Sequence, residues 1–222
     1  MGTWRTVLSV TLAAMLAASC AVNAGQGRYN RGRAPVVKDK NPALWNVDNA
    51  RVAKFKAYYM KTNTVEKALA NSRPHIRRIL PEFRRRGLPE QLAYLPMLES
   101  LFTRRADSGH ARGLWQFTPT TARAMGLRVS RYGDDRLNIP RATKAAANYL
   151  DQLGDQFDYD WALALAAYNG GPGYVERSAK SQNTQDFWAL DLREETADYI
   201  PRFVAMLQVA KEKYPHLVEG RW

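Results

Sequence analysis

The chain has very little cysteine and histidine, which argues against several kinds of site. Cys20 is the only cysteine among the 222 residues, so no disulfide can form within the chain. The three histidines, His75, His110 and His216, are scattered along the sequence. Zinc sites need cysteine and histidine ligands clustered at short spacings. We therefore expect no metal ion and no cofactor.

Recognisable nucleic-acid-binding motifs are also missing, although the chain is strongly basic. The formal net charge of +12 implies an anionic partner or surface. No helix-turn-helix, zinc-ligand spacing or RNA-binding aromatic motif supports nucleic acid as that partner. Bacterial cell wall, whose stem peptides carry carboxylates, is the partner that we favour. The alternative explanation of the net charge is a well-solvated basic surface with no specific partner.

The first 24 residues have the pattern of a secretory signal peptide. One positive charge precedes an apolar run over residues 6–18, which is too short for a transmembrane helix, and small residues follow. Cleavage after Ala24 is one processing route. The other is lipidation of Cys20, because residues 16–20 resemble a bacterial lipobox, with Ala17 where leucine is usual. We favour the lipobox, since the only cysteine ends the apolar run.

The remainder predicts a flexible linker followed by one all-α domain. Residues 25–46 are rich in glycine, asparagine, proline and basic residues without periodicity, which is typical of a linker. From residue 47 to 222 helical patterns dominate and no alternating strand pattern persists. Helices are expected over residues 52–70, 75–86, 88–102, 118–126, 141–157, 159–168 and 191–213, the last with Asp191 and Glu194 as a capping pair.

Glu99 is the acid that we expect to carry chemistry. The apolar residues Leu92, Leu95, Leu98 and Phe102 recur at helical spacing, and Glu99 falls on or beside their face. A carboxyl among leucines loses hydration, so its pKa rises, and a carboxyl that keeps its proton near neutral pH can act as a general acid. The alternative is a solvated glutamate at a fraying helix end.

Four separated motifs then occur in a fixed order. They are Glu99-Ser100, Gly113-Leu114-Trp115-Gln116, Ala167-Tyr168-Asn169, and Glu195-Thr196 with Tyr199. Together they resemble the catalytic domain of the lytic transglycosylases, of the soluble-lytic-transglycosylase type with a goose-lysozyme-like fold. The resemblance covers roughly residues 70–214 and is nearest in pattern to the membrane-bound D-type proteins of the family.

The resemblance implies an enzyme that cleaves peptidoglycan between N-acetylmuramic acid and N-acetylglucosamine and leaves 1,6-anhydromuramyl ends. It implies Glu99 as the catalytic acid and later base. The supporting or substrate-binding residues would be Ser108, Gln116, Tyr168, Asn169, Glu195 and Tyr199. From the residues alone, Tyr168 is equally a core aromatic, Glu195 a residue favoured by the helix dipole, and Trp115 a packing residue rather than a sugar platform.

Two other functions share these motifs and stay open at the level of sequence. A lysozyme-type muramidase would use the same acid with water as the acceptor, and a non-catalytic peptidoglycan-binding domain would use none of the chemistry. In each case we expect the protein in the bacterial cell envelope, as a periplasmic protein held to the outer membrane through Cys20. No protein partner can be named from the sequence.

Overall fold

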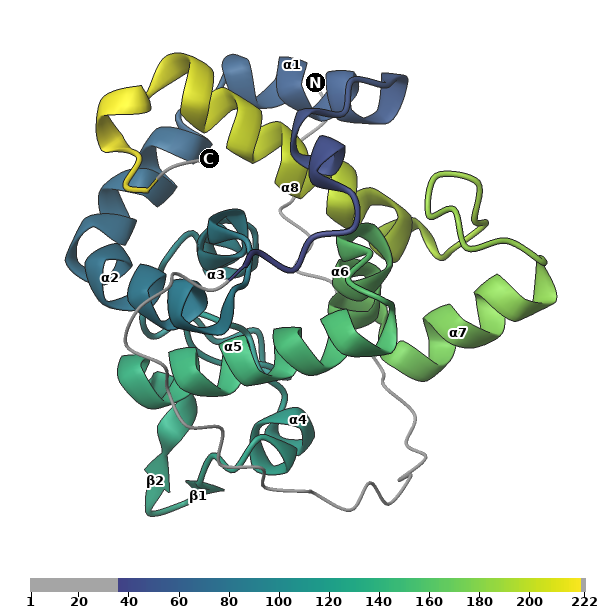
Figure 1. Cartoon of the computed structure of the whole chain (residues 1–222). Coiled ribbons are helices and arrows are strands. Elements are labelled where there is room, and N and C mark those ends of the chain that lie inside the picture. Colours follow the sequence, from purple (N-terminus) through teal and green to yellow (C-terminus); the bar gives the residue numbers. More distant parts are fainter. Residues whose placement is uncertain (1–35, 221–222) are drawn as a thin grey trace, which may run out of the picture.

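Helices make up nearly all of the regular structure in residues 36–220, the part of the chain that this computed structural model describes (Figure 1). The α-helices are α1 (Ala50–Met60), α2 (Thr64–Arg86), α3 (Pro96–Ser100), α4 (Pro119–Ala124), α5 (Ile139–Gln156), α6 (Trp161–Gly170), α7 (Pro172–Ser181) and α8 (Glu194–Lys213). Short 3₁₀ helices are η1 (Pro42–Asn46), η2 (Glu90–Tyr94), η3 (Asp135–Leu137) and η4 (Pro215–Leu217).

The strands of the described range are one antiparallel pair of two residues each. β1 (Val129–Ser130) pairs with β2 (Gly133–Asp134), with Val129 opposite Asp134. The predicted all-α class is therefore confirmed. No helix within residues 36–220 combines the length and the apolar character that crossing a membrane requires.

The core is organised around α6, which contacts α5, α7 and α8 (Figure 1). Every residue from Trp161 to Ala167 is buried. The helix starts where Asp160 accepts hydrogen bonds from the backbone of Ala162 and Leu163, and it ends before Gly171, whose φ is +91°. The buried helix thereby delivers Tyr168 and Asn169 to the edge of the core.

The first two helices differ from the expected ones. The predicted helix over residues 52–70 is interrupted at residues 61–63, because Thr62 and Asn63 favour local turns over helix continuation. The second helix does not begin at Pro74 but runs through both Pro74 and Pro81. Its buried apolar face, which includes Ile76 and Phe83, outweighs the hydrogen bonds lost at the prolines.

The helix predicted over residues 88–102 is split into η2 and α3. Pro96 has no N–H to continue a helical ladder and instead becomes the first residue of α3. The helix stops after Ser100, because Leu101 and Phe102 have φ values of +50° and +54°. The side-chain amide of Asn71 donates to the Leu101 carbonyl at 2.9 Å and holds this turn against α2.

Two differences concern the last helices. The predicted capping pair of Asp191 and Glu194 is wrong, because α8 starts at Glu194 without a side-chain cap. The backbone N–H of Asp191 instead donates to Gln182 at 2.7 Å. Helix α7 was not predicted; it begins at Pro172, directly after the Gly-rich stop of α6.

The end of the predicted linker is packed on the domain. The Lys38 backbone N–H donates to Gly87 at 2.8 Å, and its carbonyl accepts from the Trp161 indole at 2.9 Å. Leu44 and Trp45 of η1 are buried. The flexible linker predicted over residues 25–46 is therefore wrong for residues 38–46. The signal peptide over residues 1–24, Cys20 and residues 25–35 lie outside the described residues.

Candidate active site

Glu99 lies in the last turn of α3, where that short helix contacts α8. Its Oε1 accepts a hydrogen bond from the hydroxyl of Tyr199, which comes from α8. The two residues are 100 positions apart in the chain, so the fold brings them together. Glu195 precedes Tyr199 by one helical turn and faces the same site.

The carboxyl of Glu99 is enclosed by protein, although the residue as a whole keeps some solvent exposure. Loss of hydration raises its pKa to about 7, the Tyr199 hydrogen bond opposes this shift, and the charge of Glu195 adds to it. The group is therefore about half protonated at neutral pH. The apolar helical face had indicated a shift in this direction.

Two tyrosines lie near the carboxyl, Tyr199 buried and Tyr168 partly buried. Burial, and then the charge of Glu99, raise the pKa values of Tyr168 and Tyr199 well above 10. Both phenols thus stay protonated and act as hydrogen-bond donors. Tyr199 donates to Glu99, whereas Tyr168 donates to the backbone carbonyl of Trp115 at 2.7 Å. Tyr168 is in this way both a packed aromatic and a neighbour of the acid.

The Gly113–Gln116 segment is held in an unusual backbone conformation. Gly113 has a φ of +80°, and a β-carbon there would lie 2.2 Å from the carbonyl oxygen of Arg136, so only glycine fits. Gln116 has a φ of +44°, and its Nε2 donates to the Gly113 carbonyl at 2.8 Å. Its Oε1 has no hydrogen-bond donor among residues 36–220 and is left to accept from a ligand.

Trp115 is a packing residue. Its side chain is fully buried, and its ring stacks on Phe83 of α2 with centroids 5.6 Å apart. Its indole N–H donates to Thr143 of α5 at 3.2 Å. A fully buried ring presents no face to a sugar, which leaves packing as its role.

One buried ion pair and two more exposed ones connect the residues on either side of Gly113–Gln116 to the β-hairpin. The side chain of Arg136 is 6% exposed; it binds both carboxylate oxygens of Asp134, at 2.9 and 2.7 Å, and the Phe117 carbonyl at 3.1 Å. Arg112 joins Asp134 at 3.6 Å to Asp107 at 2.6 Å. We had not predicted Arg136, because an isolated arginine in sequence carries no sign of such burial.

The remaining candidates have different positions. Thr196, which is buried, donates to Oδ1 of Asn169 at 2.9 Å, whereas the amide N–H groups of Asn169 have no acceptor among residues 36–220. Ser100 links the Glu99 helix to the next motif through a 2.9 Å hydrogen bond to the Leu114 carbonyl. The Ser108 hydroxyl is engaged in its own loop, where it accepts from the Ala111 N–H at 3.0 Å.

The structure thus brings Glu99, Tyr199, Tyr168 and Glu195 together directly. Gln116 and Asn169 join them through their neighbours Trp115 and Thr196, and Ser108 has no recorded contact with the group. Within the described part of the chain, no three His, Cys, Asp or Glu residues are grouped in a way that could hold a metal ion.

Comparison with known proteins agrees with this geometry. Residues 81–190 match the family model of the transglycosylase SLT domain, and this range contains Glu99, Gln116 and Tyr168. The chain carries an SLT-type lytic transglycosylase domain, and the described residues have the all-α class that the motifs implied. Helix α8, with Tyr199, lies beyond the matched range.

The chain is similar to several proteins of known name. It is 34% identical to membrane-bound lytic murein transglycosylase D of Escherichia coli K12 over 170 residues, which are 74% of this chain and 38% of that protein. It is 40% identical over 110 residues to a putative tributyltin chloride resistance protein of Alteromonas sp. strain M-1, covering 49% of this chain and 53% of that protein. The chain thus spans well under two thirds of either relative.

Among solved structures, an inactive mutant of lytic transglycosylase Slt from Pseudomonas aeruginosa matches with a TM-score of 0.48 and 25% identity. The match covers 65% of this chain and 25% of that one.

Proposed function

We propose that the protein is a peptidoglycan lytic transglycosylase that cleaves the β-1,4 bond between N-acetylmuramic acid and N-acetylglucosamine. The observation that carries the proposal is the enclosed Glu99 carboxyl, with a pKa of about 7, in contact with Tyr199 inside an SLT domain. The printed name of the Escherichia coli relative, a lytic murein transglycosylase, supports the same activity.

Glu99 acts first as an acid. Its Oε1 already accepts the hydrogen bond of Tyr199, so the transferable proton is on Oε2. The proton passes to the glycosidic oxygen as the bond from that oxygen to C1 of the muramyl residue breaks. The acetamido group of the substrate stabilises the positive charge that develops at C1. Tyr199 stabilises the carboxylate that Glu99 becomes.

Glu99 acts next as a base. The carboxylate takes the proton of the C6 hydroxyl of the same muramyl residue, and the C6 oxygen bonds to C1. A bond to C1 is broken and another is formed, the proton is returned to Glu99, and no water is consumed. Because the C6 hydroxyl is attached to the same sugar residue as C1, it has a high effective concentration at C1 and outruns water.

The other candidates hold the sugar in this scheme. The amide N–H groups of Asn169 and the Oε1 of Gln116 suit the polar groups of an N-acetyl sugar. Tyr168 supports the Trp115 backbone next to Gln116. Burial is the main cause of the raised pKa of Glu99, and the charge of Glu195 adds to it. Ser108, whose hydroxyl stays in its own turn, shapes the loop rather than the acid's surroundings.

Digestion of purified peptidoglycan in ¹⁸O-labelled water tests the reaction. Mass spectrometry should find unlabelled 1,6-anhydromuramyl ends. Reducing ends that carry the label at C1 would make the protein a lysozyme-type hydrolase. Binding to the polymer with no new ends of either kind would make it a non-catalytic binding domain.

For the location, we propose the bacterial cell envelope, with the protein exported to the periplasm and held at the outer membrane by lipid on Cys20. The lipobox-like sequence motivates this, and the name of the Escherichia coli relative contains the words membrane-bound. Fractionation of cells that make the wild type or Cys20→Ala tests it. Equal release of both into the soluble fraction, with a mature chain starting at Gly25, would disprove the anchor.

A further inference from the structure

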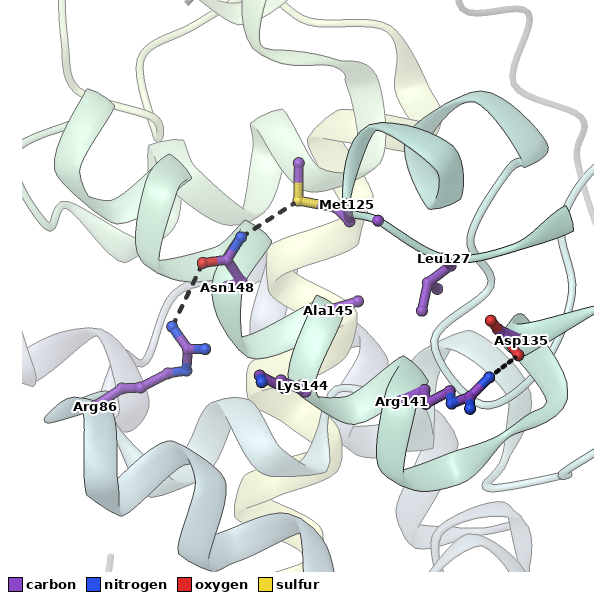
Figure 2. Close-up of a pocket in the computed structure, with 9 residues that line it drawn as sticks. Arg86, Met125, Leu127, Asp135, Arg141, Lys144, Ala145 and Asn148 are labelled. Atoms are coloured by element: carbon purple, nitrogen blue, oxygen red, sulfur yellow. Dashed lines mark hydrogen bonds and ion pairs between the residues drawn. The ribbon is translucent and has the colours of Figure 1, made fainter. Parts of the chain in front are cut away.

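A pocket of about 480 Å³ lies between the end of α2, the turn that follows α4 and the start of α5. None of its lining residues belongs to the site around Glu99. Figure 2 shows Lys144 between two other cations, with Arg86 on one side and Arg141 on the other. The volume is in the range typical of small-ligand pockets.

The three cations differ in how far they are already neutralised. Arg86 contacts Glu82 at 2.9 Å and is only 17% exposed, so its charge is largely balanced. Arg141 contacts Asp135 at 2.8 Å, but its side chain is 60% exposed. Lys144 is exposed and forms no ion pair with another residue in the range 36–220. The pocket therefore has an uncompensated positive charge at its centre.

A side-chain amide next to these cations is also poorly satisfied. The Nδ2 of Asn148 has only the sulfur of Met125 as its partner, at 3.8 Å, and its Oδ1 accepts from Arg86 at 3.5 Å (Figure 2). Both contacts are long for hydrogen bonds of their kind. The amide can thus donate to a ligand that enters beside Lys144.

We infer that this pocket binds a carboxylate of a peptidoglycan stem peptide, with Lys144 and Asn148 as its principal contacts. The inference rests on the proposed function. A single carboxylate suits the pocket better than a phosphate does, because the charge of Asp135 in its wall repels a dianion more strongly than a monoanion. The buried side chains of Leu127 and Ala145 supply apolar surface for a short aliphatic side chain.

The two helices that line the pocket, α2 and α5, also hold Trp115 of the Gly113–Gln116 segment in place. Phe83, which stacks on Trp115, precedes Arg86 by one turn of α2, and Thr143, which binds the Trp115 indole, is next to Lys144. Helices α2 and α5 thus contact the Gly113–Gln116 segment and also form the pocket. If the pocket binds the stem peptide while the site around Glu99 binds the glycan, each contact raises the effective concentration for the other, and the overall affinity for the polymer increases.

Calorimetric titration of the purified protein with a sugar-free stem tetrapeptide measures binding to the pocket. The peptide has no glycosidic bond, so the measurement does not depend on catalysis. Lys144→Glu should weaken binding about tenfold or more, because a charge-assisted hydrogen bond becomes a repulsion. Lys180→Glu, at an exposed position in the last turn of α7, is the matched control and should bind like the wild type. Thermal unfolding of both variants checks that they fold.

Two further probes identify the ligand chemistry. A tetrapeptide with amidated carboxyl groups should bind as weakly to the wild type as the free tetrapeptide binds to Lys144→Glu. Inorganic phosphate should bind no more tightly than the amidated peptide. Equal binding of the tetrapeptide by wild type and Lys144→Glu would overturn the proposal, and so would binding of phosphate in preference to the peptide.

Turnover separates this inference from the proposed function. Lys144→Glu should cleave peptide-bearing peptidoglycan more slowly than the wild type and cleave peptide-free glycan strands at the wild-type rate. Equal rates on both substrates would contradict a role of the pocket in the reaction. A wild type that cleaves neither substrate would instead refute the transglycosylase assignment, and the calorimetric result would still decide whether the pocket binds the peptide.

Discussion

The hydroxyl of Tyr199 donates to Oε1 of Glu99, so the acid comes from α3 and its stabilising group from α8. The hydrogen bond favours the carboxylate, while burial favours the protonated acid. The balance places the pKa at about 7, close to the pH at which one group can serve as donor and then as acceptor of a proton.

Glu99→Gln should abolish turnover and keep the fold. The amide has nearly the shape of the acid but cannot donate a proton, and general acid–base groups contribute about 10²–10⁴-fold to rates. Release of anhydromuropeptides measures the loss. Glu194→Gln, an exposed acid at the start of α8, is the control and should react like the wild type. Comparable rates for the two variants would place the catalytic acid elsewhere.

The pH dependence of stability should differ between the wild type and Glu99→Gln. Folding raises the pKa of Glu99 from 4.5 to about 7, so the native state binds more protons between these values. The wild type should therefore lose stability relative to the variant as pH rises from about 4.5 to about 7, by up to about 3 kcal/mol, and the difference should stay constant above pH 7. Denaturant unfolding at several pH values measures it. A difference that does not depend on pH would show an unshifted carboxyl.

Tyr199→Phe should raise the pKa of Glu99 further, because the hydrogen bond that opposes protonation is lost. The alkaline limb of the pH–rate profile should move to higher pH, and the maximal rate should fall about tenfold, since the carboxylate loses one stabilising donor. Tyr58→Phe, at a 58% exposed position, is the control. A profile with unchanged limbs would disprove the coupling.

Thr196→Val should weaken substrate binding through Asn169. The valine keeps the buried volume but removes the hydroxyl that donates to Oδ1 of Asn169 at 2.9 Å, so the amide is no longer held in one orientation. We expect about a tenfold loss in kcat/KM, mostly in KM. Thr196→Ser should restore the wild-type value. Failure of serine to restore it would make Thr196 a packing residue only.

Gly113→Ala should destabilise the fold far more than Gly109→Ala. Both glycines have positive φ, of +80° and +84°, but a β-carbon at Gly113 would lie 2.2 Å from the Arg136 carbonyl, whereas nothing lies within 4 Å of one at Gly109. The first change should cost about 3 kcal/mol or more and the second about 1 kcal/mol. Thermal unfolding distinguishes them, and equal costs would show that the close approach is unimportant.

The site was predictable where its chemistry follows from residue types in order. The sequence motifs contain four of the candidate residues, namely Glu99, Gln116, Tyr168 and Tyr199. The composition of α6, rich in Trp, Ala and Leu, likewise indicates a buried helix. Arg136 was not predictable, because its burial depends on a hairpin partner and on the carbonyl of Phe117. A sequence pattern of single residues does not report such contacts.

The helix boundaries failed for a related reason. Pro74 and Pro81 weaken a helix locally, yet α2 is continuous because the core contacts of Ile76 and Phe83 stabilise it. Asp191 and Glu194 have the spacing of a capping pair, but the side chain of Gln182 accepts the hydrogen bond of the Asp191 backbone N–H instead. In each case a partner distant in sequence outweighs a local preference.

Docking of residues 38–46 on the domain sets how far a tethered enzyme can act. If Cys20 carries lipid, the segment between the anchor and the docked residues ends at Lys38 rather than at Asn46, because Lys38 is hydrogen-bonded to both Gly87 and Trp161. At most about 3.3–3.6 Å per residue, the tether then reaches about 60 Å instead of about 90 Å. The enzyme would work only on glycan strands within that shell, so lengthening the segment before Lys38 would admit more distant strands to cleavage.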